Sequence, residues 1–355
     1  MDSLLETMTR RIRPLTTLAD EDRVVLFPTL AQPSPDGGHW MVNVHGDVSA
    51  PRRLSFGKRV LLKLLKRAMR ASDEEMTSSL FQERIARFVA SDQAGRRVTV
   101  RIGDEVHRMP QKTRRNGHFQ AAVRIPDSLA RRCAESAAVG AERYLELEVV
   151  GASATGQAYL VDPTGLSIIS DIDDTLKHSY VSCKRTLLAN TFLRQFETIP
   201  GMAPLFRDWW SQGAAFHYVS SSPWQLYGHL AEHLADEGFP TGSFHLRSFR
   251  LRDHLLRRIL MLRRSGKLGV IRSLFQMFPG RRFLLVGDSG EHDPEIYGAL
   301  ARRYPRQVTG ILIRQLDGQR NLRRRYARAF RRVEPGLVQL FSDAAELTSV
   351  RLPSV

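Results

Sequence analysis

The pattern of apolar and polar positions changes character about halfway along the chain. Up to about Gly165, short alternating or β-branched stretches predict strands at residues 23–27, 39–48, 97–101, 118–125, 144–150 and 157–161. A helical period over residues 58–70 and 73–89 predicts two helices among them. Asn116-Gly117 lies between two expected strands and predicts a hairpin turn. We therefore expect an antiparallel, sandwich-like β domain with a helical insertion over residues 1–162.

From Pro163 onward, apolar strands alternate with helical patterns. We expect strands at residues 166–170, 214–220, 243–246, 282–286 and 308–313, and helices at residues 184–197, 223–237, 267–278 and 295–304. This alternation predicts a parallel sheet with helices on both faces, over residues 163–345. The expected fold class is therefore α/β, preceded by a β-rich domain. The β-rich part carries no paired acids, histidine cluster or nucleophile arrangement, so we expect it to serve as a docking or scaffold module.

The first strand of the α/β part ends in a cluster of acids. Asp171, Asp173 and Asp174 follow the apolar run directly, and Thr175 comes next. Ligands of open α/β sheets bind outside the carboxyl ends of the strands. Acids this close repel one another unless a cation is present, and oxygen ligands favour Mg²⁺. A helix cap is the alternative, but a cap needs only one such residue.

Two further strands also end in polar residues. Ser220, Ser221 and Ser222 follow the second strand, and the stretch from Gly287 to Asp293 follows the fourth. Lys267 opens the helix before that fourth strand. Because the carboxyl ends of parallel strands meet at one edge of the sheet, these groups are expected near the acid cluster.

These motifs together resemble the haloacid-dehalogenase phosphatase superfamily. The first motif is matched by Asp171, Asp173 and Thr175, the second by Ser220, the third by Lys267, and the fourth by Asp288 and Asp293. More closely, residues 162–314 look like the actin-patch phosphatidate phosphatase family. The stretches 170–175, 218–224 and 287–295 carry this closer match.

The resemblance implies a haloacid-dehalogenase-like Rossmannoid fold and a role for each matched residue. Asp171 would attack phosphorus, Asp173 would act as acid and base, and Thr175 would support them. Ser220 and Lys267 would hold phosphoryl oxygens. The implied cofactor is Mg²⁺, bound by Asp171, the backbone carbonyl of Asp173 and Asp288, with Asp293 orienting Lys267 or a water of the ion.

Other polar residues have less specific expectations. Ser221, Trp224, Arg247 and Arg250 are candidates for substrate binding, although Trp224 also fits a place in the core. We expect Asp174 to be a structural hydrogen-bond acceptor. His217 and His292 are expected to be structural, because a lone histidine usually is.

Size and charge narrow the possible settings. The chain has 355 residues, 42% hydrophobic residues and a net charge of +16, which favours polyanionic partners. Two cysteines, Cys133 and Cys183, give no disulfide framework and fit a reducing compartment. No signal peptide and no run near the roughly 18 apolar residues of a membrane span occur. The expected location is cytoplasmic, soluble or peripheral to a membrane.

Two basic amphipathic patterns, residues 58–67 and 320–332, add a possible membrane contact. Each equally fits a surface helix whose apolar stripe packs inward. The short intervals between motifs leave no room for a large lid, which suits a bulky substrate. The leading prediction is a Mg²⁺-dependent phosphatase for phosphatidate or a related lipid phosphate. Two alternatives stay open: a phosphatase for nucleic-acid phosphate ends, and a non-catalytic anion-binding adaptor.

Overall fold

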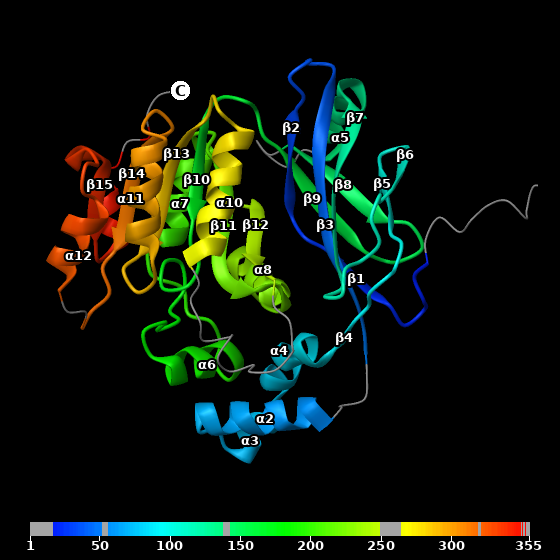
Figure 1. Cartoon of the computed structure of the whole chain (residues 1–355), viewed down its shortest axis with the longest axis horizontal. Helices are drawn as coiled ribbons and strands as arrows, with labels where there is room; N and C mark the ends of the chain where they lie inside the picture. The colour runs from blue at the N-terminus through cyan, green and yellow to red at the C-terminus, as the bar shows by residue number, and fades with distance from the viewer. Residues whose placement is uncertain are drawn as a thin grey trace, which may run out of the picture. The chain divides into compact units, whose positions relative to one another are not determined.

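The chain divides into two compact units (Figure 1). The computed structural model describes residues 17–51, 56–137, 143–248, 264–318, 321–348, 350 and 352. The first unit consists of Met1–Arg53 and Ala90–Val161, and the second of Leu54–Val89 and Asp162–Val355. The change of pattern near residue 162 thus coincides with a unit boundary, whereas residues 54–89 group with the second unit.

Hydrogen bonds join the strands of the first unit into one nine-stranded mixed sheet. Only β2 and β9 pair in parallel; the other described pairs are antiparallel. The expected two-sheet sandwich is not confirmed. The core consists of inward-facing side chains such as Val42, Ile125 and Leu147, all fully buried. The strands are β1 (Arg23–Leu26), β2 (Thr29–Pro33), β3 (His39–Ala50), β4 (Ser91–Asp92), β5 (Thr99–Ile102), β6 (Glu105–Arg108), β7 (His118–Pro126), β8 (Tyr144–Val149) and β9 (Thr155–Leu160), and the helix is α5 (Asp127–Ala137).

The turn at Asn116-Gly117 exists, but it does not form the expected hairpin. Gly117 has φ +76°, and a Cβ there would lie 2.4 Å from the carbonyl oxygen of Val48, so a side chain is excluded. In the described pairings β5 joins β6 and β8, while β7 joins β3. Two strands flanking a turn signal are therefore not necessarily partners, because β6 lies between them in the chain.

The second unit contains the predicted parallel sheet, with all its strand pairs parallel. Its strand order is β12-β11-β10-β13-β14-β15, so the chain reverses its direction of winding between β10 and β13. A crevice for ligands is expected at that switch, beyond the carboxyl ends of both strands. The strands are β10 (Leu166–Ser170), β11 (Ala215–Pro223), β12 (Ser243–Arg247), β13 (Arg282–Asp288), β14 (Val308–Arg314) and β15 (Val338–Phe341).

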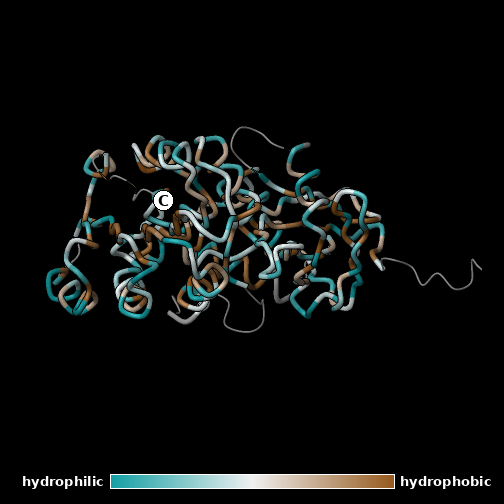
Figure 2. Tube along the Cα trace, turned by 90° about the horizontal axis from the view of Figure 1, so that it is seen from above, coloured by the Kyte–Doolittle hydropathy of each residue, from teal (hydrophilic) through white to brown (hydrophobic). Residues whose placement is uncertain are grey.

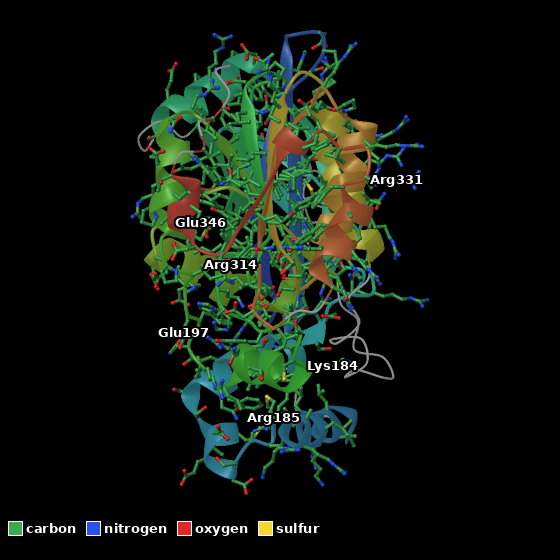
Figure 3. The ribbon with its side chains drawn as sticks, turned by 90° about the vertical axis from the view of Figure 1, so that its left-hand side faces the viewer. Lys184, Arg185, Glu197, Arg314, Arg331 and Glu346 are labelled. Atoms are coloured by element: carbon green, nitrogen blue, oxygen red, sulfur yellow. The ribbon has the colours of Figure 1, made fainter. Side chains whose placement is uncertain are left out.

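Helices cover both faces of this sheet. Figure 3 views the sheet from its β15 edge: α7 and α8 lie on one side, and α10, α11 and α12 on the other. In Figure 2, coils of the trace carry both hydrophilic and hydrophobic residues, as expected for helices with one buried face. The sequence patterns missed α7 and β15. The helices are α6 (Lys184–Phe192), α7 (Met202–Ser211), α8 (Tyr227–Asp236), α10 (Arg264–Met277), α11 (Asp293–Arg303) and α12 (Leu322–Ala329), with 3-10 turns η1 (Trp224–Leu226), η2 (Pro335–Leu337) and η3 (Ala344–Leu347).

The helical insertion packs on α6 of the second unit, not within the β-rich unit as expected from its place in the sequence. It comprises α2 (Phe56–Met69), α3 (Asp73–Thr77) and α4 (Ser79–Val89). Phe81 and Phe88 of α4 contact the ring of Phe192, with centroids 6.3 and 5.2 Å away. Arg185 lies between α6 and α2 in Figure 3, and its Nε donates to the carbonyl oxygen of Met69 at 3.3 Å.

The second basic pattern forms α12, whose apolar side is covered. Tyr326 and Ala329 are buried, and α12 packs on α11. Arg331 points away from the unit in Figure 3. For this helix the inward-packed interpretation therefore applies. In the described part of the chain, no helix combines the length and apolarity that crossing a membrane requires.

Candidate active site

Asp171 is the first residue beyond β10 and is fully buried. Its backbone N–H donates to the carbonyl oxygen of Val286 at 2.9 Å, which continues the pairing of β10 with β13. The hydroxyl of Thr175 lies 3.4 Å from Asp171 Oδ2, so a tight turn brings the end of the motif back to its beginning. The Asp171 carboxylate is therefore fixed at the switch point of the sheet.

Asp174 shapes that turn. It has φ +57°, and its carboxylate accepts hydrogen bonds from the backbone N–H groups of Ser179, Tyr180 and Val181 at 2.7 to 2.8 Å. Arg314, at the carboxyl end of β14, donates to its carbonyl oxygen at 3.0 Å. Asp174 is thus a structural acceptor, in agreement with the expectation.

Asp173 is held by four side-chain donors. Its Oδ1 accepts from Lys177 Nζ at 2.8 Å and Ser179 Oγ at 2.7 Å. Its Oδ2 accepts from Ser220 Oγ at 2.9 Å and Ser222 Oγ at 2.7 Å. Burial opposes ionisation, but Lys177 and the hydroxyls outweigh it and lower the pKa of Asp173 below its usual range. The carboxylate is therefore charged and fully paired.

Lys267, near the start of α10, forms ion pairs with the acids. Its Nζ lies 2.5 Å from Asp293 Oδ1, 2.9 Å from Asp171 Oδ1 and 3.7 Å from Glu291 Oε2. Burial works against the ammonium, but these carboxylates outweigh it and raise the pKa of Lys267 well above its usual value. One buried cation thus faces several buried carboxyl groups.

Asp288 is the last residue of β13 and Asp293 is the first residue of α11, so the two acids flank the loop between these elements. A Cβ on Gly287 would lie 2.2 Å from Asp293 Oδ2, so glycine is needed for Asp293 to approach. The N–H groups of Gly290 and Glu291 donate to Asp288 Oδ1. Burial raises the pKa of Asp288 well above its usual value, and Asp293 raises it further. Burial likewise raises the pKa of Asp171, against Lys267.

These acids fit a hard divalent cation. Asp171, Asp288 and Asp293 each offer a carboxylate oxygen, and the three oxygens lie within 4.8 Å of one another. Asp288 Oδ2 has no hydrogen-bond partner among the described residues. Asp171 Oδ1 accepts none of good geometry from them either, although Lys267 is close. Buried acceptors left unpaired in a cluster of like charges are what an oxygen-coordinated cation would satisfy. The side chain of Asp173 points instead to its four donors.

Glu291 is an acid that the sequence interpretation did not select. It is buried, and its Oε2 accepts from Ser221 Oγ at 2.9 Å. Burial, opposed by Lys267, raises the pKa of Glu291 to about 7. Ser221, a candidate for substrate binding, therefore contacts this acid. The signal was present, because Glu291 lies inside the stretch that carries the family resemblance.

Arg325 of α12 contacts the loop between β13 and α11. It donates to the carbonyl oxygens of Ser289 and Glu291, and its Nε and Nη2 each lie 2.8 Å from the carboxylate of Glu295. Such a two-pronged pair fixes orientation as well as charge. The basic pattern of residues 320–332 therefore contains a bracing residue that sequence alone did not distinguish from its neighbours.

Three candidates for substrate binding remain: Trp224, Arg247 and Arg250. Trp224 is buried in η1, which contacts α4. Arg247 lies at the carboxyl end of β12, in register with Pro223. Arg250 falls in the stretch 249–263, outside the described residues. His217 is buried between the hydroxyls of Ser167 and Ser243, so its role is structural as expected.

Fold and site together define an α/β protein with buried acids and a lysine at the switch point of a parallel sheet. Residues 166–315, all in the second unit, match the family described as phosphatidate phosphatase APP1, catalytic domain. Over 166 residues the chain is 34% identical to phosphatidate phosphatase APP1 of Saccharomyces cerevisiae, a stretch covering 46% of this chain and 28% of that protein. Over 162 residues it is 36% identical to an uncharacterized protein of Schizosaccharomyces pombe, covering 44% and 26%.

The chain thus spans less than a third of the length of these relatives. The matched residues support the APP1-like family suggested by the motifs. They include every acid of the site, Ser220 and Lys267. They exclude the helical insertion and α12, so Arg325 lies outside the match.

Proposed function

We propose that this chain is a phosphatidate phosphatase of the haloacid-dehalogenase type. One observation supports the proposal: at one edge of the parallel sheet the structure brings together a lysine and four acids, Lys267, Asp171, Asp173, Asp288 and Asp293. All five lie within residues 166–315, which match the APP1 catalytic domain. The reaction is the hydrolysis of a phosphomonoester of a lipid, which leaves an alcohol and inorganic phosphate.

The first half of the reaction joins Asp171 to the phosphoryl group. A carboxylate oxygen of Asp171 attacks phosphorus and forms an aspartyl-phosphate, while the bond to the leaving oxygen breaks. Asp173 gives that oxygen a proton, so the product leaves as an alcohol. In the second half, Asp173 takes a proton from water as the water attacks phosphorus, and the bond between Asp171 and phosphorus breaks. The proton then leaves Asp173 with the released phosphate, which restores both carboxylates.

Asp173 begins this cycle as a charged carboxylate, because its four donors favour that form. It is therefore ready to act as the base of the second half. To act as the acid of the first half it must acquire a proton, which a substrate monoanion can supply. Ser220 donates to Asp173 in the structure, so its hydroxyl must turn to hold a phosphoryl oxygen.

The acid cluster is the part of the site that would hold Mg²⁺, through Asp171 and Asp288, with Asp293 beside them. When bound, the cation offsets the charge of the carboxylates and of the phosphate. Lys267 already neutralises part of this charge and lies where it can also contact a phosphoryl oxygen.

Contact with an anionic membrane is a further part of the proposal, and α2 is the surface that supports it. The helix contains no acidic residue, and Arg59, Lys63 and Arg67 are exposed on it. Val60 and Leu64, one turn apart, are 38% and 43% exposed. Basic residues beside exposed aliphatic ones are typical of a helix lying in a lipid interface. Val60→Ser with Leu64→Ser should weaken sedimentation with phosphatidate vesicles and leave hydrolysis of p-nitrophenyl phosphate unchanged.

The central experiment measures phosphate release from phosphatidate vesicles, lysophosphatidate and 5′-phosphorylated oligonucleotides, with Mg²⁺ and with EDTA. We expect Mg²⁺-dependent release from the lipids, lost in Asp171→Asn. Faster release from oligonucleotides, in a reaction that weakens steeply with salt, would indicate a nucleic-acid phosphatase. No release from any substrate would indicate a binding protein, and release by Asp171→Asn would exclude the mechanism.

A further inference from the structure

Lys177 is a buried cation to which neither the motifs nor the family match assigns a role. It is 3% exposed, and its Nζ donates to Asp173 Oδ1 at 2.8 Å and to Ser179 Oγ at 2.6 Å. It belongs to the same turn as Asp173, because the N–H of Asp174 donates to the carbonyl oxygen of Lys177 at 2.8 Å. Because a buried charge is costly when unpaired, this ion pair favours an orientation of the Asp173 carboxylate that faces Lys177.

The ring of Phe196 lies against this ammonium, with its centroid 4.5 Å from Lys177 Nζ. The segment that carries Phe196 is tied to the turn by backbone hydrogen bonds. The N–H of His178 donates to Glu197, and that of Ile199 to Leu176, both at 2.8 Å. Lys177 and Thr198 form an isolated β-bridge. Phe196 is therefore held in place over Lys177.

The other side of this segment is held by Arg84 of the inserted helix α4. Its guanidinium carbon lies 3.9 Å from the centroid of the same Phe196 ring. Its Nη1 donates to the carbonyl oxygens of Asn190, Thr191 and Arg194, where α6 ends. Arg84 is 3% exposed, and burial lowers its pKa to about 10. A cation at a helix C-terminus is favoured by the helix dipole.

The insertion also reaches the neighbouring strand of the site. Helix α4 contacts η1, which directly follows the serines at the end of β11, and α6, which follows the turn after β10. The inserted helices thus pack on segments that follow the site residues in the chain: α6 follows the turn with Asp171 and Asp173, and η1 follows Ser220 at the end of β11. This arrangement makes them a structural part of the site, although they precede it in sequence by about 80 residues.

We propose that Lys177 is a positioning residue for Asp173, and that Arg84 of the insertion supports it through Phe196. The inference rests on the proposed function, because it concerns the delivery of a proton to the leaving oxygen. A misplaced Asp173 should matter most for a leaving group that cannot depart without a proton. Phosphatidate releases an alcohol, whereas p-nitrophenyl phosphate releases an anion that is stable in water.

The test compares kcat for these two substrates in variants of the full chain. Lys177→Met should lower kcat for phosphatidate by about 10- to 100-fold, within the usual contribution of general acid catalysis, and for p-nitrophenyl phosphate by less than about 3-fold. Arg84→Met should also lower kcat more for phosphatidate than for p-nitrophenyl phosphate. The loss for phosphatidate should be about 3- to 10-fold, since Arg84 acts on Asp173 only through Phe196 and Lys177. The exposed Lys184 and Arg272 provide matched controls, as Lys184→Met and Arg272→Met.

The double variant separates coupling from general damage. If Arg84 acts through Lys177, the variant with both substitutions should be no more selective against phosphatidate than Lys177→Met alone. Equal losses with both substrates, no loss in Lys177→Met, or additive selectivity in the double variant would overturn the inference. Asp173→Asn provides the reference. If it lacks the substrate preference, or if wild type hydrolyses neither substrate, the proposed function itself is wrong.

Discussion

Buried charged groups lie at both ends of the central strand β10, but their hydrogen bonding differs. At its amino end, Arg281 donates to the carbonyl oxygens of Asp162, Thr164 and Leu166 and to the hydroxyl of Ser167. At its carboxyl end, Asp171 and Asp288 retain oxygens that no described residue satisfies with good geometry. A saturated buried charge indicates a contribution to folding, whereas an unsaturated cluster indicates a site for a ligand.

The largest expected effect is at the amino end. Arg281→Met removes the donor for three carbonyl groups and for the hydroxyl of Ser167, and should lower the free energy of unfolding of the second unit by about 3 kcal/mol. Its neighbour Arg282 is exposed, so Arg282→Met is the matched control. Urea titration measures the loss, and kcat of the folded fraction should stay unchanged. Lower kcat without lower stability would show that the two ends are not separate in function.

The second effect concerns Mg²⁺ at the carboxyl end. At 100 times its dissociation constant, the ion should stabilise the folded protein by about 2.7 kcal/mol. Thermal unfolding with Mg²⁺ or EDTA detects this without any substrate. Asp288→Asn should remove most of the shift, and Asp208→Asn, at an exposed position on α7, should leave it intact. An equal shift in both variants would place the ion elsewhere.

A smaller effect is expected when one charge of the cluster is removed. Since the pKa of Asp171 is raised by burial, its ionised form costs stability at neutral pH. Asp171→Asn should therefore raise the free energy of unfolding in EDTA by about 1 to 3 kcal/mol while it abolishes turnover. A less stable variant would mean that the pair with Lys267 outweighs the repulsion among the acids.

The smallest effect is a dependence on pH at His217, near the amino end. Burial lowers the pKa of His217 well below its usual 6.5, so the folded protein keeps it neutral while the unfolded chain takes up a proton. The contribution of His217 to the free energy of unfolding is complete above pH 6.5. Below pH 6.5 this contribution declines as pH falls, by about 1.4 kcal/mol per pH unit. His217→Gln should make stability less dependent on pH between 6.5 and 5. An unchanged slope would assign the dependence to other groups.

The sequence predicted five of the six strands of the parallel sheet, because these are largely apolar runs that end in polar residues, and missed β15. The residues Asp171, Ser220 and Asp288 meet for that reason alone. Lys177, by contrast, reaches Asp173 through a turn in which Asp174 has a positive φ, and no periodicity announces such a turn. The sequence interpretation also did not select Glu291, although it is adjacent to the motif acids in the sequence. The place of the inserted helices was not predictable either, since their contacts with α6 depend on chain folding across about 100 residues.

Two arginines that lie outside the matched segment have a consequence for how such a protein can be inherited. Arg84 approaches the site from the chain before residues 166–315, and Arg325 from the chain after them. A gene rearrangement that moved only the matched segment would carry every acid but neither arginine. The segment that similarity detects is therefore smaller than the compact unit that contains it, which also includes the flanking helices.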